Sequence, residues 1–257
     1  MPAVTWPIRA SLRVSEPFVP TLNFASMISR YTVGLHHFGL GALLVLLAFT
    51  GCAPREKAGQ ANLRAAADTV SDSVLAEKLE NSRYEGNPRA PIWIVMVSDF
   101  QCPYCKVWHD STLAAVRRDY VATGRARLAY LNLPLQMHSH ARVMASAALC
   151  AGAQDKFWPF ADSLFSKQAT IAKLPDAEPE IQAASHALQL DSNAFAHCRA
   201  SHVVNSVIAS DMRQAAQAQI QSTPSFFVGQ FLLQGAVPYP GFKRAVDSAL
   251  VVAAQKH

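Results

Sequence analysis

Two apolar runs of strand length stand out in the first half of the folded part of the chain. Residues 92–97 read Ile-Trp-Ile-Val-Met-Val, and such a continuous run is typical of a strand buried on both faces of a central sheet. Residues 126–133 place apolar side chains at alternate positions, which predicts a second strand. The residues from Pro103 to about Val121 have a helical pattern, so we expect strand, helix and strand in this order.

The pattern changes to that of helices throughout residues 140–219. Apolar residues such as Phe157, Phe160, Leu164 and Phe165 follow i, i+3 and i+4 spacing, and we expect these aromatic residues in the core. Prolines at positions 175 and 179 and an Asp-Ser-Asn sequence at positions 191–193 interrupt the pattern. The region is therefore predicted to form four or five helices.

The C-terminal part returns to strands. Residues 225–228 and 231–234 are apolar runs on either side of a Gly-Gln turn, and a final helix is predicted over residues 242–254. On the N-terminal side, residues 71–79 predict a short helix and residues 81–89 a turn containing Gly, Asn and Pro.

The N-terminal part is expected to be an export signal over residues 1–51. Residues 38–51 are uncharged, and their length of about 14 residues falls short of the roughly 20 of a spanning helix. Arg30 supplies the positive flank, and prolines interrupt the residues before Met27, so we expect translation to start at Met27. The residues ending at Cys52 resemble a bacterial lipoprotein box, which implies lipid on Cys52.

An uncleaved membrane anchor and simple secretion are the alternatives to lipidation. With lipid on Cys52 the protein is expected to be periplasmic and anchored to the membrane, and residues 52–80 to be a lipid-anchored tether and short helix. The formal net charge of +5 is small, and no run of Lys or Arg occurs, so the composition does not favour nucleic acid as a partner.

The candidate chemistry lies in Cys102-Pro103-Tyr104-Cys105, directly after the first predicted strand. The thiolate is the reactive form of cysteine, and a helix N-terminus favours it; Pro103 suits the first helical turn. We expect Cys102 to be exposed at the helix start as the nucleophile and Cys105 to lie behind it as the resolving thiol, near enough for a redox-active disulfide. The alternatives to a redox-active pair are half of a zinc site and an inert structural disulfide. Zinc needs four ligands and no second ligand pair follows in the sequence, so no metal is expected.

The segment Asp99-Phe100-Gln101-Cys102-Pro103-Tyr104-Cys105 resembles the active site of DsbA-type thiol:disulfide oxidoreductases, in their thioredoxin-like, lipoprotein-containing branch. The resemblance continues in order through residues 133–138, 147–151, 154–158 and 222–228. It implies an α/β fold, a thioredoxin-like fold with an inserted all-helical domain. The thioredoxin-like halves are expected at residues 81–136 and 221–257, and the helical insertion at residues 137–220.

The resemblance also implies a cis peptide bond before Pro224 and a backbone contact between Thr223 and an extended substrate. A trans proline at the start of an edge strand is the alternative. One departure is at Met96, where several relatives have a buried acid that assists proton transfer from the second cysteine. Asp99 is the nearest carboxylate, and it could cap the helix or face solvent, so the proton acceptor for Cys105 stays open.

The remaining cysteines, Cys150 and Cys198, lie in the predicted helical region. In an oxidising compartment they could form a structural disulfide, and two buried thiols are the alternative. His138 and His140 follow the second strand and are interpreted as structural.

The function expected from these features is thiol:disulfide exchange in exported proteins, as a dithiol oxidase that introduces disulfides. A disulfide reductase or isomerase is the alternative, and a periplasmic copper chaperone is an alternative of another class. The expected partners are unfolded or partly folded exported proteins and a membrane redox partner that resets the cysteine pair. No cofactor is expected, and the protein is expected to be a monomer. The sequence leaves the direction of electron flow open.

Overall fold

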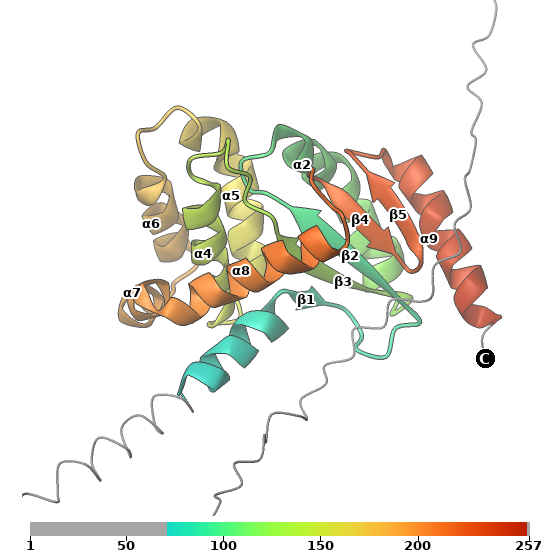
Figure 1. Cartoon of the computed structure of the whole chain (residues 1–257), viewed down its shortest axis with the longest axis horizontal. Coiled ribbons are helices and arrows are strands. Elements are labelled where there is room, and N and C mark those ends of the chain that lie inside the picture. Colours follow the sequence, from blue (N-terminus) through green and yellow to red (C-terminus); the bar gives the residue numbers. More distant parts are fainter. Residues whose placement is uncertain (1–70, 256–257) are drawn as a thin grey trace, which may run out of the picture. The chain divides into compact units, whose positions relative to one another are not determined.

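The computed structural model describes residues 71–255, and these form a central five-stranded sheet with helices on both faces (Figure 1). The strand order is β1-β3-β2-β4-β5; β2 and β3 are parallel, and the other neighbours are antiparallel. The strands are β1 (Tyr84–Glu85), β2 (Ile92–Ser98), β3 (Ala126–Asn132), β4 (Ser225–Val228) and β5 (Phe231–Gln234). Both halves of the chain therefore supply the sheet, as the order of apolar runs predicted.

The helical connection between β2 and β3 covers one face of the sheet. It comprises α2 (Pro103–Trp108), the π-helical turn η1 (His109–Leu113), α3 (Ala114–Val116) and the π-helical turn η2 (Arg117–Val121). Trp108 is fully buried and contacts the rings of Phe226 in β4 and Phe242, at centroid distances of 4.5 and 5.2 Å. This aromatic contact fixes α2 against the middle of the sheet.

Five helices lie between β3 and β4, which confirms the predicted helical region. They are α4 (Ala141–Gly152), α5 (Phe157–Ile171), α6 (Glu178–Ala187), α7 (Ser192–Ala200) and α8 (His202–Gln217). Asp191 caps the start of α7 by accepting a hydrogen bond from the backbone of Ala194. Phe157, Phe160 and Phe165 are buried, as their spacing predicted.

Helix α8 crosses the sheet on the face opposite α2 (Figure 1). Ala215 of α8 packs with Val97 of β2 in a second apolar cluster, whereas the neighbouring Met96 lies in the main core cluster. Consecutive strand residues point to opposite faces, so the two clusters lie on the two sides of the sheet. The last helix, α9 (Tyr239–Ala254), adds Phe242 to the α2 side.

Three local predictions need correction. β2 is not buried on both faces along its whole length. Trp93 near its start is 38% exposed, and only the C-terminal end of β2 is buried on both faces. The segment 81–89 is not only a turn, since it contains β1, whose two residues pair with β3. The final helix begins at Tyr239 rather than Phe242, because a proline in the first turn is compatible with helix.

A buried ion pair joins the N-terminal helix, residues 71–82, to α8. Arg83 Nη1 donates to Asp211 Oδ1 at 2.6 Å, and the Asp211 side chain is fully buried. Asp211 also accepts hydrogen bonds from the backbone and side-chain nitrogens of Asn132, at 3.0 and 2.9 Å. The pair therefore ties α8 to the end of β3.

Across residues 71–255, no helix combines the length and hydropathy needed to cross a bilayer.

Candidate active site

The loop from β2 to α2 places Cys102 at the N-cap of α2, directly before Pro103. The backbone of Cys102 is extended, with φ −69° and ψ 121°, and its N–H donates to the carbonyl of Asp99 at 3.1 Å. The carbonyl of Cys102 accepts the first helical hydrogen bond, from Lys106, at 3.2 Å. The Cys102 sulfur thus lies where the free N–H groups of a helix start favour negative charge.

The side chain of Asp99 holds this loop from inside. It is fully buried; Oδ1 accepts from the backbone of Gln101 at 2.7 Å, and Oδ2 accepts from the backbone of Leu135 at 2.8 Å. The same Oδ2 lies 2.7 Å from Nδ1 of His138. Asp99 therefore does not face solvent, and it links the loop to the segment that follows β3.

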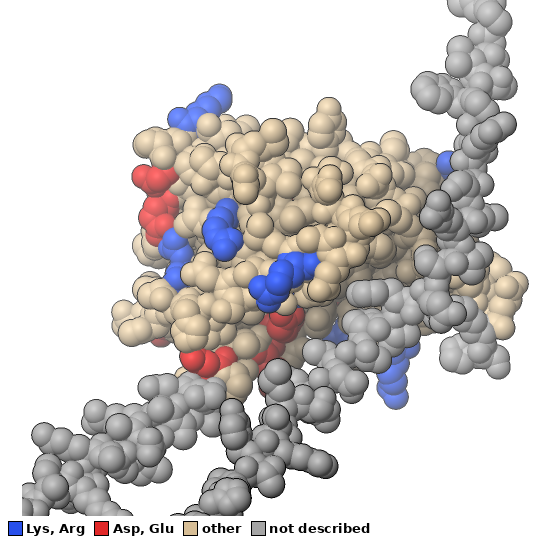
Figure 2. Space-filling view, viewed as in Figure 1, with Lys and Arg blue, Asp and Glu red and all other residues tan. Residues whose placement is uncertain are grey.

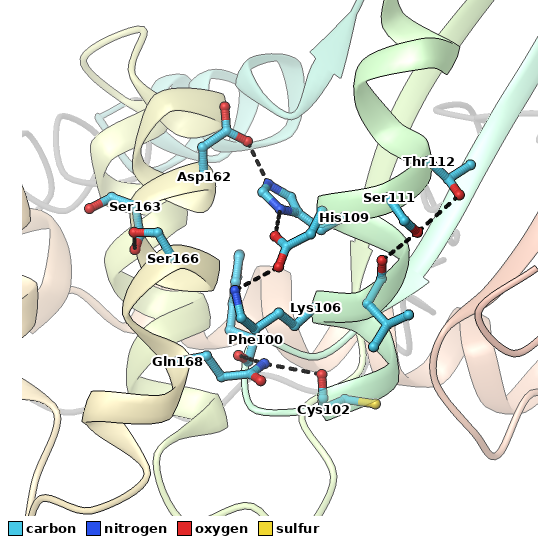
Figure 3. Close-up of polar contacts among 12 residues, drawn as sticks. Phe100, Cys102, Lys106, His109, Ser111, Thr112, Asp162, Ser163, Ser166 and Gln168 are labelled. Carbon is cyan, nitrogen blue, oxygen red and sulfur yellow. Dashed lines mark hydrogen bonds and ion pairs between the residues drawn. The ribbon is translucent and has the colours of Figure 1, made fainter. Parts of the chain in front are cut away.

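Gln168 of α5 holds the loop from the helical side (Figure 3). Its Nε2 donates to the carbonyl oxygens of Phe100 and Cys102, at 2.7 and 3.0 Å. The Gln168 side chain is buried, so the carbonyl oxygens of Phe100 and Cys102 accept hydrogen bonds from a protein donor where water cannot reach them. The sequence pattern gave no signal for Gln168, because a polar residue on a helix is usually at the surface.

The third support comes from the loop before β4. The peptide bond between Thr223 and Pro224 is cis, and the carbonyl oxygen of Thr223 lies 3.3 Å from the Cys102 sulfur, which donates to it only in its protonated, thiol form. Thr223 is 121 residues beyond Cys102, so only the sheet brings the two together. Of the residues expected at the site, Cys102, Cys105, Thr223 and Pro224 all belong to this one region.

The expected exposure of Cys102 is wrong. Its side chain is 4% exposed, because the Thr223 loop lies over the sulfur and the residue caps a helix that packs against α5. Cys105 is also buried, and both cysteines are free thiols in this structure. The Thr223 loop therefore limits access to the Cys102 sulfur.

The two thiols differ strongly in acidity. The pKa of Cys102 is lowered from 9.0 to about 6, chiefly by a hydrogen bond from the Cys105 thiol, with burial opposing the shift and Thr223 and backbone N–H groups assisting. Burial raises the pKa of Cys105 well above its ordinary value, and the hydrogen bond to Cys102 adds to this. Cys102 is thus the thiolate at neutral pH and Cys105 the protonated donor.

Two buried hydroxyl groups near Cys105 were not singled out by the sequence pattern. Ser98 and Tyr130 lie on the adjacent strands β2 and β3, and Ser98 Oγ and Tyr130 Oη are buried without a hydrogen bond of ordinary geometry to a described residue. Tyr130 was expected only as an alternating core residue. Met96 of β2 pairs in register with Tyr130 of β3.

His109 takes no part in this region. It begins η1 and points toward α5: its Nε2 lies 2.8 Å from Asp162 of α5 and its Nδ1 2.9 Å from Asp110 (Figure 3). Among residues 71–255, no group of three His, Cys, Asp or Glu side chains is arranged to hold a metal ion.

Cys150 of α4 and Cys198 of α7 form a disulfide, with a Cα–Cα distance of 5.6 Å. Both are buried within the helical region, so the bond pins these two helices together away from the loop at Cys102. Cys52 and the signal expected before it lie outside the described residues.

Comparison with known proteins agrees with this fold. A thioredoxin family model matches residues 78–248, well over half of the chain, and the chain belongs to this family. It is 26% identical over 171 residues to a probable disulfide bond formation protein D of Bacillus anthracis, covering 64% of this chain and 76% of that protein. The crystal structure of Wolbachia pipientis alpha-DsbA1 superposes with a TM-score of 0.60 at 20% identity, covering 68% of this chain and 93% of that one.

The protein is therefore a thioredoxin-fold thiol:disulfide oxidoreductase of the DsbA type. A Na(+)/H(+) antiporter NhaA 1 of Salinispora arenicola also matches, with 28% identity over 181 residues. That match covers 70% of this chain but only 26% of the antiporter, so the chain corresponds to about a quarter of that protein.

Proposed function

We propose that the protein introduces disulfide bonds into exported proteins, with Cys102 as the nucleophilic sulfur and Cys105 as the resolving sulfur. The observation that carries the proposal is the pKa of Cys102, lowered to about 6. A stabilised thiolate favours the reduced pair, and a favoured reduced pair makes the disulfide a stronger oxidant. A lowered pKa is shared by thioredoxin, at about 7, and by DsbA, at about 3.5, so the acidity of Cys102 supports exchange chemistry and the potential decides its direction.

In the proposed reaction a substrate thiolate attacks the Cys102 sulfur of the Cys102–Cys105 disulfide. The disulfide breaks, the electron pair leaves with the Cys105 sulfur, and a mixed disulfide joins the substrate to Cys102. A second substrate thiolate then attacks the substrate sulfur of the mixed disulfide and releases Cys102 as a thiolate. The protein is left as a dithiol and the substrate gains a disulfide. A membrane redox partner then accepts the two electrons from the dithiol.

An apolar surface beside Cys102 suits unfolded substrates. Tyr104 and Val107 of α2 are 64% and 53% exposed, and Met137, in the loop bound to Asp99, is 81% exposed. The region around α2 and β4 on the face shown in Figure 2 is largely free of charged side chains. Unfolded chains present apolar side chains that such a surface would bind without a specific sequence.

The decisive experiment for the oxidase assignment is the reduction potential of the Cys102–Cys105 pair, with oxidative refolding of a reduced substrate as the activity. We expect a potential well above that of thioredoxin, which is about −270 mV. A value near thioredoxin's would favour the reductase or isomerase alternative instead. Stoichiometric binding of Cu(I) by the reduced protein without any turnover would favour a copper chaperone.

The Cys105→Ala variant tests the roles of the two sulfurs. Without its resolving thiol, Cys102 should accumulate a mixed disulfide with substrate, visible as a shifted band on a non-reducing gel. The Cys102→Ser variant should form none. Trapping through Cys105 in the Cys102→Ser variant would reverse the assignment.

The proposed location is the periplasm, with the protein held at the membrane by lipid on Cys52 and acting as a monomer. Mass spectrometry of the protein from membranes tests this directly. A lipid-modified Cys52 at the N-terminus supports it. An unmodified Cys52 in the protein, or recovery of residues 1–26 in the mature chain, contradicts the lipid anchor or the start at Met27 respectively.

A further inference from the structure

The buried resolving thiol has no carboxylate from position 96 beside it. When a disulfide at Cys102 is attacked, the Cys105 sulfur leaves with an electron pair inside the core, where its side chain is 2% exposed. A charged sulfur in such a place needs hydrogen-bond donors or a proton. Met96 can supply neither, since a thioether has no hydrogen to donate.

The neighbouring strand offers a donor at the same level of the sheet. In the parallel pairing of β2 and β3, Met96 is in register with Tyr130, and Ser98 follows two residues later on the same face as Met96. The ring of Tyr130 stacks on that of Phe100 in the active-site loop, with centroids 5.0 Å apart and planes 11° apart. Tyr130 is thereby held beneath the loop that carries Cys102.

Both hydroxyls are buried and lack an ordinary partner. Ser98 and Tyr130 are each 1% exposed, and neither oxygen forms a hydrogen bond of ordinary distance and angle with a described residue, although the Ser98 hydroxyl lies close enough to act on both Tyr130 and Cys105. Buried hydroxyls in folded proteins are nearly always satisfied, so two hydroxyls whose only polar neighbours of this kind among residues 71–255 are each other and Cys105 call for an explanation. A sulfur that becomes negative during the reaction would provide the missing acceptor.

The acidities fit this arrangement. Burial is the largest influence on Cys105 and raises its pKa, but the Ser98 hydroxyl lies near enough to favour the thiolate, as does the backbone of Asp99. Burial also raises the pKa of Tyr130 well above 10.0, and the charge of Cys105 is the next cause. Tyr130 therefore stays protonated and can act only as a donor.

We propose that the hydroxyls of Ser98 and Tyr130 form the hydrogen-bond site for the Cys105 thiolate and take the place of a buried carboxylate at position 96. This proposal rests on the proposed exchange reaction, in which Ser98 and Tyr130 would be positioning residues. As the Cys102–Cys105 bond breaks, the electron pair moves to Cys105 and the two hydroxyls turn toward it. The thiolate then takes one proton from solvent, and the hydroxyls keep theirs.

Other titratable groups near this site have defined partners. Cys102 is hydrogen-bonded to Thr223, and Asp99 to Gln101, Leu135 and His138. The side chains packed around Met96 and Tyr130 from the other elements are neutral: Phe226 of β4, Phe157 and Trp158 of α5, and Phe100 of the loop. The groups that act on the pKa of the resolving thiol are therefore Cys102, the hydroxyl of Ser98 and the backbone of Asp99, with Tyr130 beside them.

The test compares Tyr130→Phe, Ser98→Ala and the double variant with the wild-type protein. Two quantities are measured: the rate at which dithiothreitol reduces the Cys102–Cys105 disulfide as a function of pH, and the pKa of Cys105 from its Cβ chemical shift in the reduced protein. Losing one hydrogen bond to a charged group should slow reduction by about tenfold and raise the Cys105 pKa by about one unit. Tyr120→Phe is the matched control, because its hydroxyl binds Asp247 elsewhere, and it should change neither quantity.

Ser98→Thr separates the hydroxyl from mere packing. Threonine suits a strand and retains the hydroxyl, so its Cys105 pKa should stay near the wild-type value while that of Ser98→Ala rises. The comparison of Ser98→Ala with Ser98→Thr still tests the proposal if Tyr130→Phe does not fold. Near-ultraviolet circular dichroism would reveal such a folding defect. Equal Cys105 pKa values in wild type, Ser98→Ala and Ser98→Thr would overturn the proposal. A wild-type protein without exchange activity would instead contradict the proposed function itself.

Discussion

The sulfur of Cys102 lies 3.3 Å from the carbonyl oxygen of Thr223, across 121 residues of sequence. The contact places a backbone acceptor over the reactive sulfur and limits the exposure of that sulfur to 4%. The loop before β4 therefore belongs to the immediate surroundings of this sulfur.

The acidity of Cys102 leads to the first prediction. Because its pKa is lowered to about 6, the rate of alkylation of the reduced protein by iodoacetamide should rise as the pH passes through about 6 and then level off. Cys105 should contribute little below pH 9, since burial raises its pKa. The rate constant against pH measures this directly, with Cys102→Ser as the control. A midpoint near that of an ordinary thiol would contradict the assigned hydrogen bond from Cys105.

The same shift predicts how the stability of the reduced protein depends on pH. In the unfolded chain the thiol keeps its proton up to about its ordinary pKa of 9.0, whereas in the folded protein it loses the proton at about 6. The unfolded state therefore binds more protons in this window, and the free energy of unfolding should rise from about pH 6 toward pH 9. The gain is lost as the pH falls through about 6. Urea unfolding of the reduced protein should show this rise, and unfolding of the Cys102→Ser variant should lack it.

Gln168 should control the geometry of the active-site loop. Gln168→Leu removes the donor to the carbonyls of Phe100 and Cys102 and leaves both buried without it. We expect an exchange rate lowered by about tenfold and a loss of stability of about 1–3 kcal/mol. Gln182→Leu is a suitable control on α6, since that amide binds only the nearby Glu178. An unchanged exchange rate in Gln168→Leu would show that the loop keeps its position without this donor.

The buried pair of Arg83 and Asp211 should be important for stability and not for chemistry. Asp211→Ala leaves the buried guanidinium of Arg83 with Glu80 as its one remaining acid among the described residues and takes the acceptor from the donors of Asn132, so we expect a loss of about 3 kcal/mol. The double variant Arg83→Met with Asp211→Leu should recover much of it, because it removes both charges. Lys243→Ala, at an exposed pair with Asp247, should change little. Chemical denaturation gives these values, and a lower exchange rate per folded molecule would argue for an additional role.

The Cys150–Cys198 disulfide should likewise act on stability alone. It closes a loop with a sequence separation of 48, for which the chain-entropy model gives a stabilisation of about 4 kcal/mol. The Cys150→Ala, Cys198→Ala protein should unfold at lower denaturant and retain the reduction potential of the Cys102–Cys105 pair. A displaced potential in a folded variant would indicate that the two disulfides are coupled.

The sequence by itself determined the order of elements and the reactive pair. Local patterns carry this information: an apolar run of strand length at residues 92–97, helical spacing after residue 140, and a Cys-Pro-Tyr-Cys sequence at a helix start. The short strand β1 escaped prediction because two residues have no period. The prediction that Cys102 is exposed was wrong because Thr223, which lies over its sulfur, is 121 residues away in the sequence.

Tertiary structure decided the surroundings of the two sulfurs. The carbonyl of Thr223 and the amide of Gln168 reach the site from the loop before β4 and from α5, and Tyr130 lies in register with Met96 on β3, so their places depend on strand register and helix packing rather than on neighbours in sequence. Burial and hydrogen bonding, which follow from that packing, separate the acidities of Cys102 and Cys105. A sequence pattern can identify two cysteines as a pair, but only the folded chain makes one of them a thiolate and keeps the other protonated.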